Sequence, residues 1–510
     1  MQNLHDQLPP LFLQELPLHA LLDWTDKSLK LKLPAIKSCT LFFYTITPKQ
    51  KINHVEHLTL DNINHGRSNL FIKPDPYSTL ESSSADNSCT TMYNSFSPVT
   101  EDLVNFKHKL KQLETVMFSD LYEDLVGNGG IELQDMEIWK EMVEGVPKRD
   151  LKQVLIACAD AISNNDFSTA GILISELREM VSVAGEPIQR LGAYMLEGLV
   201  ARLSAQKTSL CNDLGSGTHN LLSYTNMLHE ICPYFKFGYM SANGAIAEAM
   251  KNEKKVHIVD FQIGQGSQWI PLIQAFAARR GGPPRIRITA FTDSMSVNVG
   301  QRLCKLARSF NVPFEFNSIS ISVSKAGVDQ FRLRPGEALA VNFAFVLHHM
   351  ADESVSTENH RDRILRVVKS LKPKVVTLIE QESNTNTSPF YPRFLEALDY
   401  YNAMFESMDE SLPRGHKERI NVEQYCLAKD VVNIIACEGN ERVERHELLG
   451  KWKLRFRMAG FNPYPLSSLV NGTIKTLLKK YSDRYRLEER DGALYLGWMD
   501  RDLVASCAWK

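Results

Sequence analysis

The pattern of apolar and polar positions becomes regular at residue 150 and predicts a series of amphipathic helices. In the first helix, apolar residues recur at intervals of three and four, which places them on one face: Leu151, Val154, Leu155, Cys158, Ala159 and Ile162. Similar stripes follow over 167–177, 187–203 and 221–228, with short polar connections between them. Consecutive amphipathic helices of this kind are typical of a helical bundle, so we expect an N-terminal helical cap.

A different pattern begins at residue 256. The run 256–260 is apolar and β-branched, a turn with two glycines follows it, and the apolar segment 269–276 favours a helix. Strand, glycine turn and helix form the opening unit of a Rossmann-like sheet. The alternation continues through strands at 285–291, 314–316, 338–345 and 374–380 and helices at 299–310, 360–371, 390–405, 422–436 and 451–459. The order predicts an α/β fold with a mostly parallel sheet.

The chain ends in two apolar runs, 493–498 and 503–509, joined by a short polar segment. This pattern predicts a β-hairpin that completes the sheet with antiparallel strands. Trp498 and Trp509 lie on its two arms, and two large aromatic side chains so near a terminus indicate a docked hairpin rather than a frayed one. We therefore expect the last strand to be an integral part of the sheet, with Trp509 buried against a flanking helix.

The first part of the chain lacks a sustained period. Residues 1–100 are therefore expected to be variable and disordered, and residues 101–147 to form a helical linker with a partial apolar stripe. Residues 18–22 fit an L-x-x-L-L pattern, which can dock as a short helix in a partner groove. For so short a pattern, chance occurrence is the commoner explanation.

Composition narrows the classes of function. The 510 residues carry a formal net charge of -2, so no global basic field draws the chain to nucleic acid. The 9 cysteines have no paired C-x-x-C spacing, which favours a reducing compartment and argues against structural zinc. His348, His349 and His360 lack the accompanying cysteine or carboxylate spacing of a metal site, so we expect no metal. No apolar stretch is long enough to span a bilayer, so no membrane association is expected.

The turn after the first strand resembles the cofactor turn of the S-adenosylmethionine-dependent methyltransferase fold, which reads acid-x-Gly-x-Gly-x-Gly. Here it reads Asp260-x-Gln262-x-Gly264-x-Gly266, so a glutamine replaces the first glycine. Asp293, at the end of the second strand, occupies the place of the ribose-binding acid in such folds. The resemblance implies a relict cofactor turn made of Asp260, Gly264, Gly266 and Asp293.

Two histidines follow the fourth strand. The segment 346–353 is similar to the region of small-molecule O-methyltransferases that carries a general-base histidine. Imidazole titrates near neutrality, so His348 or His349 could act as a base. A structural role for both is the simpler interpretation because the glycine turn is damaged. The alternative function is an S-adenosylmethionine-dependent O-methyltransferase of a small molecule.

Basic residues gather in three places along the chain. The first group consists of Arg279, Arg280, Arg285 and Arg287, the second of Arg442, Arg445, Lys451, Lys453, Arg455 and Arg457, and the third of Lys475, Lys479, Lys480, Arg484 and Arg486. Acids interleave the second group, which is typical of a solvated helix face rather than a phosphate-binding surface. No helix-turn-helix, zinc-finger or basic-zipper spacing is evident.

Three motifs in order carry a more specific resemblance. The first strand, Val256, His257, Ile258, Val259 and Asp260, resembles the VHIID motif of the plant GRAS family of transcriptional regulators, with valine replacing its second isoleucine. The PFYRE region is matched by Pro389, Phe390, Tyr391, Arg393 and Glu396. The SAW motif is matched by Ser506, Ala508 and Trp509, with Cys507 interrupting the string.

The resemblance to the GRAS family covers residues 148–510. It implies a leucine-rich helical cap at 148–237, a VHIID region at 238–336, a second leucine-rich region at 337–371, a PFYRE region at 372–450 and a SAW region at 451–510. The segment 107–117 further resembles the phytochrome A signal transduction branch, close to the SCARECROW-like proteins.

The resemblance also implies a function. It predicts a regulator of plant development and of light or hormone signalling that works in the nucleus, with the cytoplasm as a second compartment. The expected partners are other transcription factors, together with a homo- or hetero-dimer through the helical cap. Direct contact with DNA stays open, and indirect contact is favoured. The resemblance implies no catalysis and no cofactor, which agrees with Gln262 in the turn.

Overall fold

The computed structural model describes residues 150–204, 218–292, 298–413 and 415–510. The expected disordered region 1–100, with its L-x-x-L-L pattern, and the expected linker 101–147 lie outside the described residues, and so does Asp293. The helices are α4 (Leu151–Ser163), α5 (Phe167–Met180), α6 (Pro187–Leu203), α8 (Thr218–Ile231), α9 (Pro233–Ala249), α10 (Trp269–Ala277), α11 (Val299–Ser309), α12 (His360–Ser370), α13 (Phe390–Asp409), α14 (Lys417–Val422), α15 (Ala428–Ala436), α16 (Leu449–Met458) and α17 (Ser468–Leu478).

The strands form one mixed sheet. They are β1 (Lys255–Asp260), β2 (Arg285–Phe291), β3 (Phe314–Ile319), β4 (Ala338–Ala344), β5 (Val375–Gln381), β6 (Pro463–Tyr464), β7 (Tyr485–Arg490), β8 (Ala493–Trp498) and β9 (Arg501–Trp509). Their order is β3-β2-β1-β4-β5-β9-β8-β7, and β6 pairs with β9 outside this path. Strands β1 to β5 run parallel to one another, whereas the pairs β5–β9, β9–β8 and β8–β7 are antiparallel. The expected fold class is thereby confirmed.

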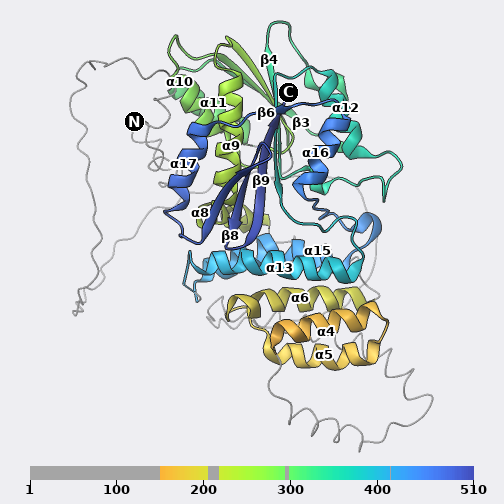
Figure 1. The fold of residues 1–510 in the computed structure, drawn as a ribbon. Helices are drawn as coiled ribbons and strands as arrows, with labels where there is room; N and C mark the ends of the chain where they lie inside the picture. The colour runs from red at the N-terminus through yellow and green to blue at the C-terminus, as the bar shows by residue number, and fades with distance from the viewer. Residues whose placement is uncertain (1–149, 205–217, 293–297, 414) are drawn as a thin grey trace, which may run out of the picture. The chain divides into compact units, whose positions relative to one another are not determined.

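Helices cover both faces of this sheet (Figure 1). Alternate residues of a strand point to opposite faces, so β1 contributes Val256 and Ile258 to one core and Val259 to the other. The first core includes residues of α9, α10, α11 and α17, and the second includes residues of α12 and α16. Both faces of β1, β2, β4 and β5 are buried, which explains why these strands read as near-continuous apolar runs.

The helical cap meets the core through a close helix–helix contact. Helix α6 packs against α13 and α15, and Figure 1 shows these two helices between the sheet and the layer of α4, α5 and α6. A Cβ atom at Gly198 of α6 would lie 2.9 Å from the Cβ of Ile435 in α15, so only glycine permits this approach. The expected bundle is therefore packed on the sheet domain.

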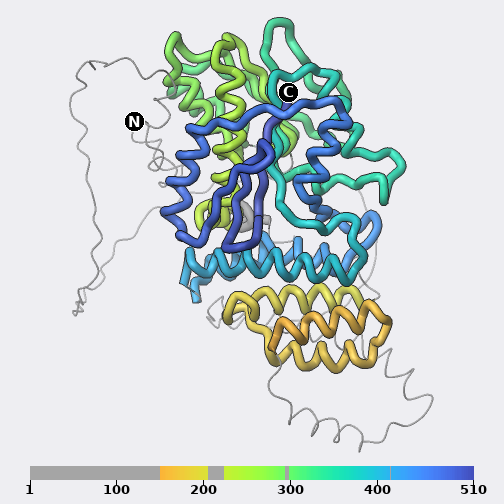
Figure 2. The backbone as a smooth tube through the Cα atoms, viewed as in Figure 1, coloured from red at the N-terminus to blue at the C-terminus, as the bar shows by residue number. Residues whose placement is uncertain are grey.

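The C-terminal strand lies inside the sheet rather than at its margin, as expected. In Figure 2 the tube traces the dark-blue C-terminal strands into the sheet, where β9 pairs with β5 on one side and β8 on the other. Trp509 is 1% exposed, and its ring stacks on Phe456 of α16 with 5.0 Å between centroids. The prediction of a docked hairpin is confirmed.

Two strands differ from the sequence expectation. No strand was predicted at 485–490, but Arg486 of the third basic group lies in β7, where it pairs with Asp502 of β9. Strand β3 is longer than predicted and extends to Ile319. Both strands lie at sheet edges, where one side meets solvent and charged or polar residues hide the strand pattern.

Candidate functional site

The first motif forms the central strand of the sheet. Val256, Ile258 and Val259 are buried core residues of β1. His257 is also fully buried, with Nε2 2.9 Å from Thr289 Oγ1 and Nδ1 3.0 Å from Arg287 Nη2. Burial, reinforced by the charge of Arg287, lowers the pKa of His257 to about 4. The imidazole is therefore neutral and holds two strands together.

Asp260 ends β1 at the edge of the sheet where Rossmann-like folds bind their ligands. Its carboxylate accepts hydrogen bonds from Trp269 Nε1 at 2.8 Å, Asn342 Nδ2 at 3.1 Å and the backbone N–H of Gln262 at 3.3 Å. Burial raises the pKa of Asp260 to about 6, although these three donors favour the charged form. The acid of the turn is thus engaged by groups of the chain itself.

The two glycines of the turn also have a structural explanation. Gly264 and Gly266 have φ angles of 49° and 71°, in the left-handed region that favours glycine. A Cβ atom at Gly266 would lie 2.7 Å from Val299 Cγ1. The side chain of Gln262 is exposed.

The hydrogen bonds around Asp260 continue into the neighbouring strands. Gln268 Nε2 lies 3.2 Å from Asn342 Oδ1, and Thr377 Oγ1 donates to the same oxygen at 2.8 Å. These bonds extend the network around Asp260 into a buried polar cluster between β1, β4 and β5. Such a network joins neighbouring strands and gives both carboxylate oxygens of Asp260 partners within the chain.

The two candidate base histidines lie in a short 3-10 turn after β4, Leu347–His349. His348 is buried, and its Nδ1 lies 2.5 Å from Glu380 Oε2 while its Nε2 lies 3.4 Å from Glu444 Oε2. Burial alone would lower the pKa of His348, but the carboxylates of Glu380 and Glu444 raise it to about 10. A protonated imidazole has no lone pair with which to remove a proton, so this geometry does not suit a general base.

The partners of these histidines come from a segment that was assigned incorrectly. Residues 442–447 were expected on a solvated helix face, but they form no helix and are largely buried. Arg445, His446 and Glu447 are exposed by 2%, 1% and 1%. The sequence contains one weak sign of this cluster, a histidine two positions after Glu444. A short-range pattern does not show which distant segments meet, so the contact with His348 and His349 could not be predicted.

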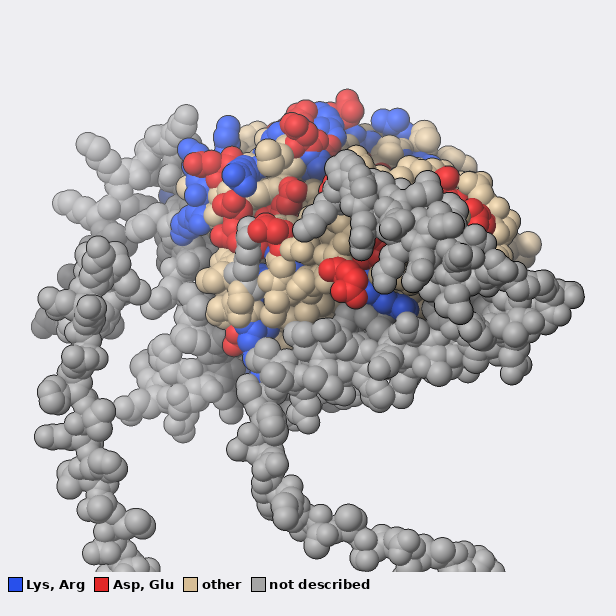
Figure 3. Space-filling model, turned by 90° about the horizontal axis from the view of Figure 1, so that it is seen from below, with Lys and Arg blue, Asp and Glu red and all other residues tan. Residues whose placement is uncertain are grey.

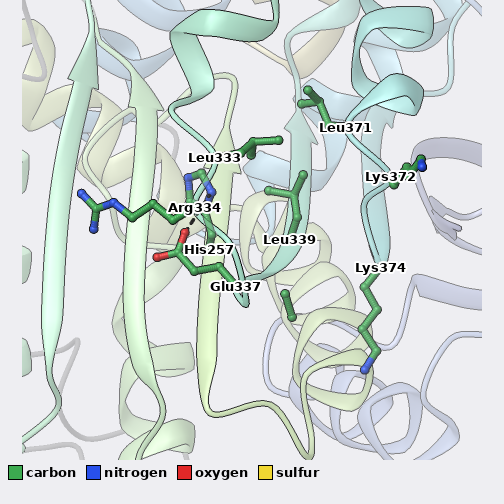
Figure 4. Close-up of a pocket in the computed structure, with 9 residues that line it drawn as sticks. His257, Leu333, Arg334, Glu337, Leu339, Leu371, Lys372 and Lys374 are labelled. Carbon is green, nitrogen blue, oxygen red and sulfur yellow. Dashed lines mark ion pairs between the residues drawn. The ribbon is translucent and has the colours of Figure 1, made fainter.

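A small pocket lies at the opposite edge of the sheet, at the amino ends of the parallel strands (Figure 4). Its volume is about 200 Å³, and His257, Arg334, Glu337, Lys372 and Lys374 contribute its polar lining. Figure 4 shows the two lysines on the side away from Arg334. Ligands of Rossmann-like folds bind at the carboxyl ends, so this pocket is not the relict cofactor site.

The second motif links the helical layer to the rest of the domain. Pro389 precedes α13, which carries Phe390, Tyr391, Arg393 and Glu396. The guanidinium of Arg393 donates to the carbonyl oxygens of Ile434 and Ser388 and pairs with Glu438. Glu396 accepts from the backbone N–H of Asn384 at 2.8 Å and pairs with Arg501 of β9.

The third motif is a part of β9. Ser506 Oγ and Ser241 Oγ of α9 lie 2.9 Å apart, while Ala508 pairs with Thr377 of β5. The Nε1–H of Trp509 points to Cys507 Sγ at 3.2 Å. The residue that interrupts the motif is therefore a buried packing neighbour of its tryptophan. Arg501, on the same strand as the third motif, pairs with Glu396 of the second motif.

A buried ion cluster between cap and core was not expected from the sequence. Arg190 of α6 pairs with Glu423 at 3.0 Å and with Asp409 of α13 at 2.8 Å. Arg419 pairs with the same Glu423 at 2.8 Å. Glu423 opens a π-helical turn, Glu423–Leu427, which offsets the helix that α14 begins. The cluster fixes the cap on the helical layer.

Residues 151–510 match the model of the GRAS domain family, which is more than half of the chain. The chain belongs to the GRAS domain family. The GRAS domain thus contains the helical cap and the sheet with all three motifs.

Relatives support the assignment. The chain is 60% identical over 480 residues to "Scarecrow-like transcription factor PAT1" of Arabidopsis thaliana, covering 90% of this chain and 97% of that one. It is 37% identical over 375 residues to "DELLA protein RGA2" of Brassica campestris, covering 71% and 62%. The first relative confirms the resemblance to the SCARECROW-like, phytochrome A branch.

A solved GRAS structure confirms the fold. The structure of SCL7 from Oryza sativa superposes with a TM-score of 0.64 at 34% identity, covering 71% of this chain and 100% of that one. Among the helices described, none is long and apolar enough to cross a membrane.

Proposed function

We propose that this GRAS chain is a transcriptional regulator of plant development and of light or hormone signalling. It acts in the nucleus, with the cytoplasm as a second compartment, and through protein contacts with DNA-binding factors. The names of the relatives support this proposal: one is called a transcription factor, and "Chitin-inducible gibberellin-responsive protein 2" of Oryza sativa subsp. japonica is 56% identical over 428 residues, covering 81% of this chain and 78% of that one.

One observation supports a non-enzymatic role: the carboxylate of the turn is hydrogen-bonded by other groups of the same chain. Asp260 is held by Trp269 and Asn342, and the glycines serve the backbone of the turn. Hydrogen bonds within the chain at this edge of the sheet support the fold, which fits a sheet that serves as a scaffold. The motif residues Arg393, Glu396 and Trp509 likewise join elements of the domain, which supports a role in shaping surfaces that bind partners.

The charge distribution supports indirect contact with DNA. On the face in Figure 3, Lys and Arg side chains alternate with Asp and Glu among the described residues drawn in colour. Many basic residues are also neutralised within the chain, as Arg455 is by Glu447, Glu353 and Asp362. Non-specific affinity for DNA depends on unneutralised cations that reach phosphates, so paired cations add little to it.

The test of this proposal is purification of the tagged full chain from plant nuclei, with and without nuclease treatment. We expect DNA-binding factors to remain bound after the nuclease, because the contact is between proteins. In parallel, the purified chain alone is incubated with a pool of random DNA sequences. Enrichment of one sequence far above the pool by the isolated chain would overturn the proposal.

We also propose that the cap forms the homo- or hetero-dimer contact. Phe167 and Ile172 of α5 are 50% and 56% exposed, whereas Leu173 and Ile174 of the same helix are buried. Replacing both exposed residues by aspartate should convert a dimer into a monomer in sedimentation velocity. The matched control is Met458→Asp on α16, a residue that is 79% exposed outside the cap. A dimer that survives the cap variants but not the control would contradict this assignment.

A further inference from the structure

A cluster of three histidines and a carboxylate lies outside the turn and the motifs described above. His348 and His349 follow β4, whereas Glu444 and His446 lie in the buried segment before α16. His348, His349 and Glu444 offer ligand atoms that all lie within 4.8 Å of one another. The Glu444 carboxylate is the centre of the cluster, because the Nε2 atom of each histidine faces one of its oxygens.

The distances from the histidine nitrogens to the Glu444 carboxylate match those between two ligands of one metal ion. His349 Nε2 lies 3.3 Å from Glu444 Oε1, and the Nε2 atoms of His348 and His446 lie 3.4 Å and 3.6 Å from Oε2. Ligands at 2.0–2.1 Å from a tetrahedral Zn²⁺ ion lie about 3.3–3.4 Å apart. The cluster therefore resembles a set of ligands gathered around a shared position.

One pair in the cluster lacks the hydrogen bond that burial demands. His446 Nε2 and Glu444 Oε2 are both buried, and neither makes a hydrogen bond among the described residues, although Glu444 Oε2 forms an ion pair with His348 Nε2 at 3.4 Å. Their separation of 3.6 Å is too long for a hydrogen bond. Buried polar atoms without partners are costly, and each such atom in a native protein calls for an explanation. A cation bound between a ring nitrogen and a carboxylate oxygen would satisfy both.

The surroundings hold the ring nitrogens in place. Glu380 accepts the Nδ1–H of His348 with Oε2, and its Oε1 accepts the backbone N–H groups of Val346 and Leu347 at 3.2 Å and 2.8 Å. His446 Nδ1 lies 3.0 Å from Thr385 Oγ1. In metal sites, the second ring nitrogen of a ligand histidine is bound in this way, which orients the first towards the ion.

We propose that His348, His349 and Glu444 form a binding site for a divalent transition-metal ion, with His446 Nε2 beside the same carboxylate. The set of imidazole nitrogens and one carboxylate favours Zn²⁺ over Mg²⁺ or Ca²⁺, which prefer oxygen ligands. The carboxylates of Glu380 and Glu444 balance the charge of the ion, which replaces the proton on His348 Nε2. The side chain of His349 is 36% exposed and gives the ion access from solvent.

The bound ion would join the turn after β4 to the segment 442–447. Sequence spacing did not reveal this site, because one pair of ligands is adjacent in the chain and the third ligand lies in a distant segment. The expectation of no metal rested on the absence of a cysteine or carboxylate spacing that defines a metal site. The tertiary structure supplies the carboxylate.

The test uses the full chain, freed of metal with a chelator and titrated with Zn²⁺ by calorimetry. The main variants are His349→Ala, a partly exposed residue, and Glu444→Gln, and the matched control is His416→Ala. His416 is a surface histidine whose side chain is 40% exposed and pairs with Glu418. Thermal melts in chelator show whether each variant still folds.

We expect one Zn²⁺ ion to bind per chain. The affinity for Zn²⁺ should fall at least about 10-fold in His349→Ala and in Glu444→Gln, and it should stay unchanged in His416→Ala. Zn²⁺ should also raise the melting temperature of the native chain, because it binds the folded form. Substitution by Co²⁺ should give a spectrum without thiolate charge-transfer bands, which separates this site from the cysteines. Equal affinity in the native chain and both cluster variants, a thiolate spectrum, or no heat with Zn²⁺ would overturn the proposal.

Discussion

Replacing Trp509 by alanine tests whether the C-terminal strand supports the whole sheet. The side chain is 1% exposed, lies on a strand held by β5 and β8, and stacks on Phe456 with an interplanar angle of 18°. A tryptophan buries about 150–250 Å². At about 25 cal/mol per Å² this area corresponds to roughly 4–6 kcal/mol, an upper bound on the loss. Because paired strands on both sides limit collapse, we expect a loss near the upper part of the usual range of about 3–5 kcal/mol.

The assay is urea denaturation of the full chain, followed by far-ultraviolet circular dichroism. In a thermal melt of the same protein, the unfolding entropy of a folded region of about 350 residues converts this loss into a fall in melting temperature of about 5 °C. Trp509→Phe keeps an aromatic ring on Phe456 and should lose only part of the stability. Met458→Ala, at a residue that is 79% exposed, should change it by less than about 0.5 kcal/mol. If Trp509→Ala unfolds at the same urea midpoint as the native chain, β9 is not an integral part of the sheet.

Three further predictions concern buried groups. Lowering the pH from 6.5 towards 4 should destabilise the fold by up to about 3 kcal/mol through His257, because its pKa is about 4 in the folded chain and the unfolded chain takes up the proton first. In His257→Gln, the midpoint of urea denaturation should therefore depend less steeply on pH than in the native chain. An equally steep dependence would contradict the assignment. Glu423→Gln removes the carboxylate shared by two buried guanidinium groups and should lower the free energy of unfolding in urea by about 3–5 kcal/mol. The control Glu418→Gln changes a half-exposed residue of α14 and should leave that free energy almost unchanged. Equal losses in the two variants would show that the cluster does not fix the cap. Titration with S-adenosylmethionine to millimolar concentration should give no saturable heat; micromolar binding that Gly266→Trp abolishes would revive the methyltransferase alternative.

Much of the fold follows from short-range patterns. The strand at 285–291 was predicted with its observed bounds, and the helix at 299–310 and the hairpin arms to within two residues. These elements are buried on a face or a stripe, so period two or period 3.6 is written directly into their residues. Strand β7 escaped because its charged residues meet solvent at the sheet edge.

The candidate sites divide in the same way. The sequence alone determined that Asp260 and two glycines end a buried strand, because the turn is local and its backbone needs glycine. Only the tertiary structure decided that Trp269 and Asn342 occupy the carboxylate of Asp260. The pairing depends on the order of strands in the sheet, and the residue spacing within one strand carries no information about that order.

The histidine cluster shows the limit most clearly. The sequence by itself determined that His348 and His349 follow a buried strand, and it favoured a structural role for them over a catalytic one. The tertiary structure alone placed Glu444 and His446 against them, and it buried Arg445 where a solvated helix face was expected. The physical reason is that charged residues reveal burial only through their partners, and these partners are brought together by the packing of segments far apart in the chain.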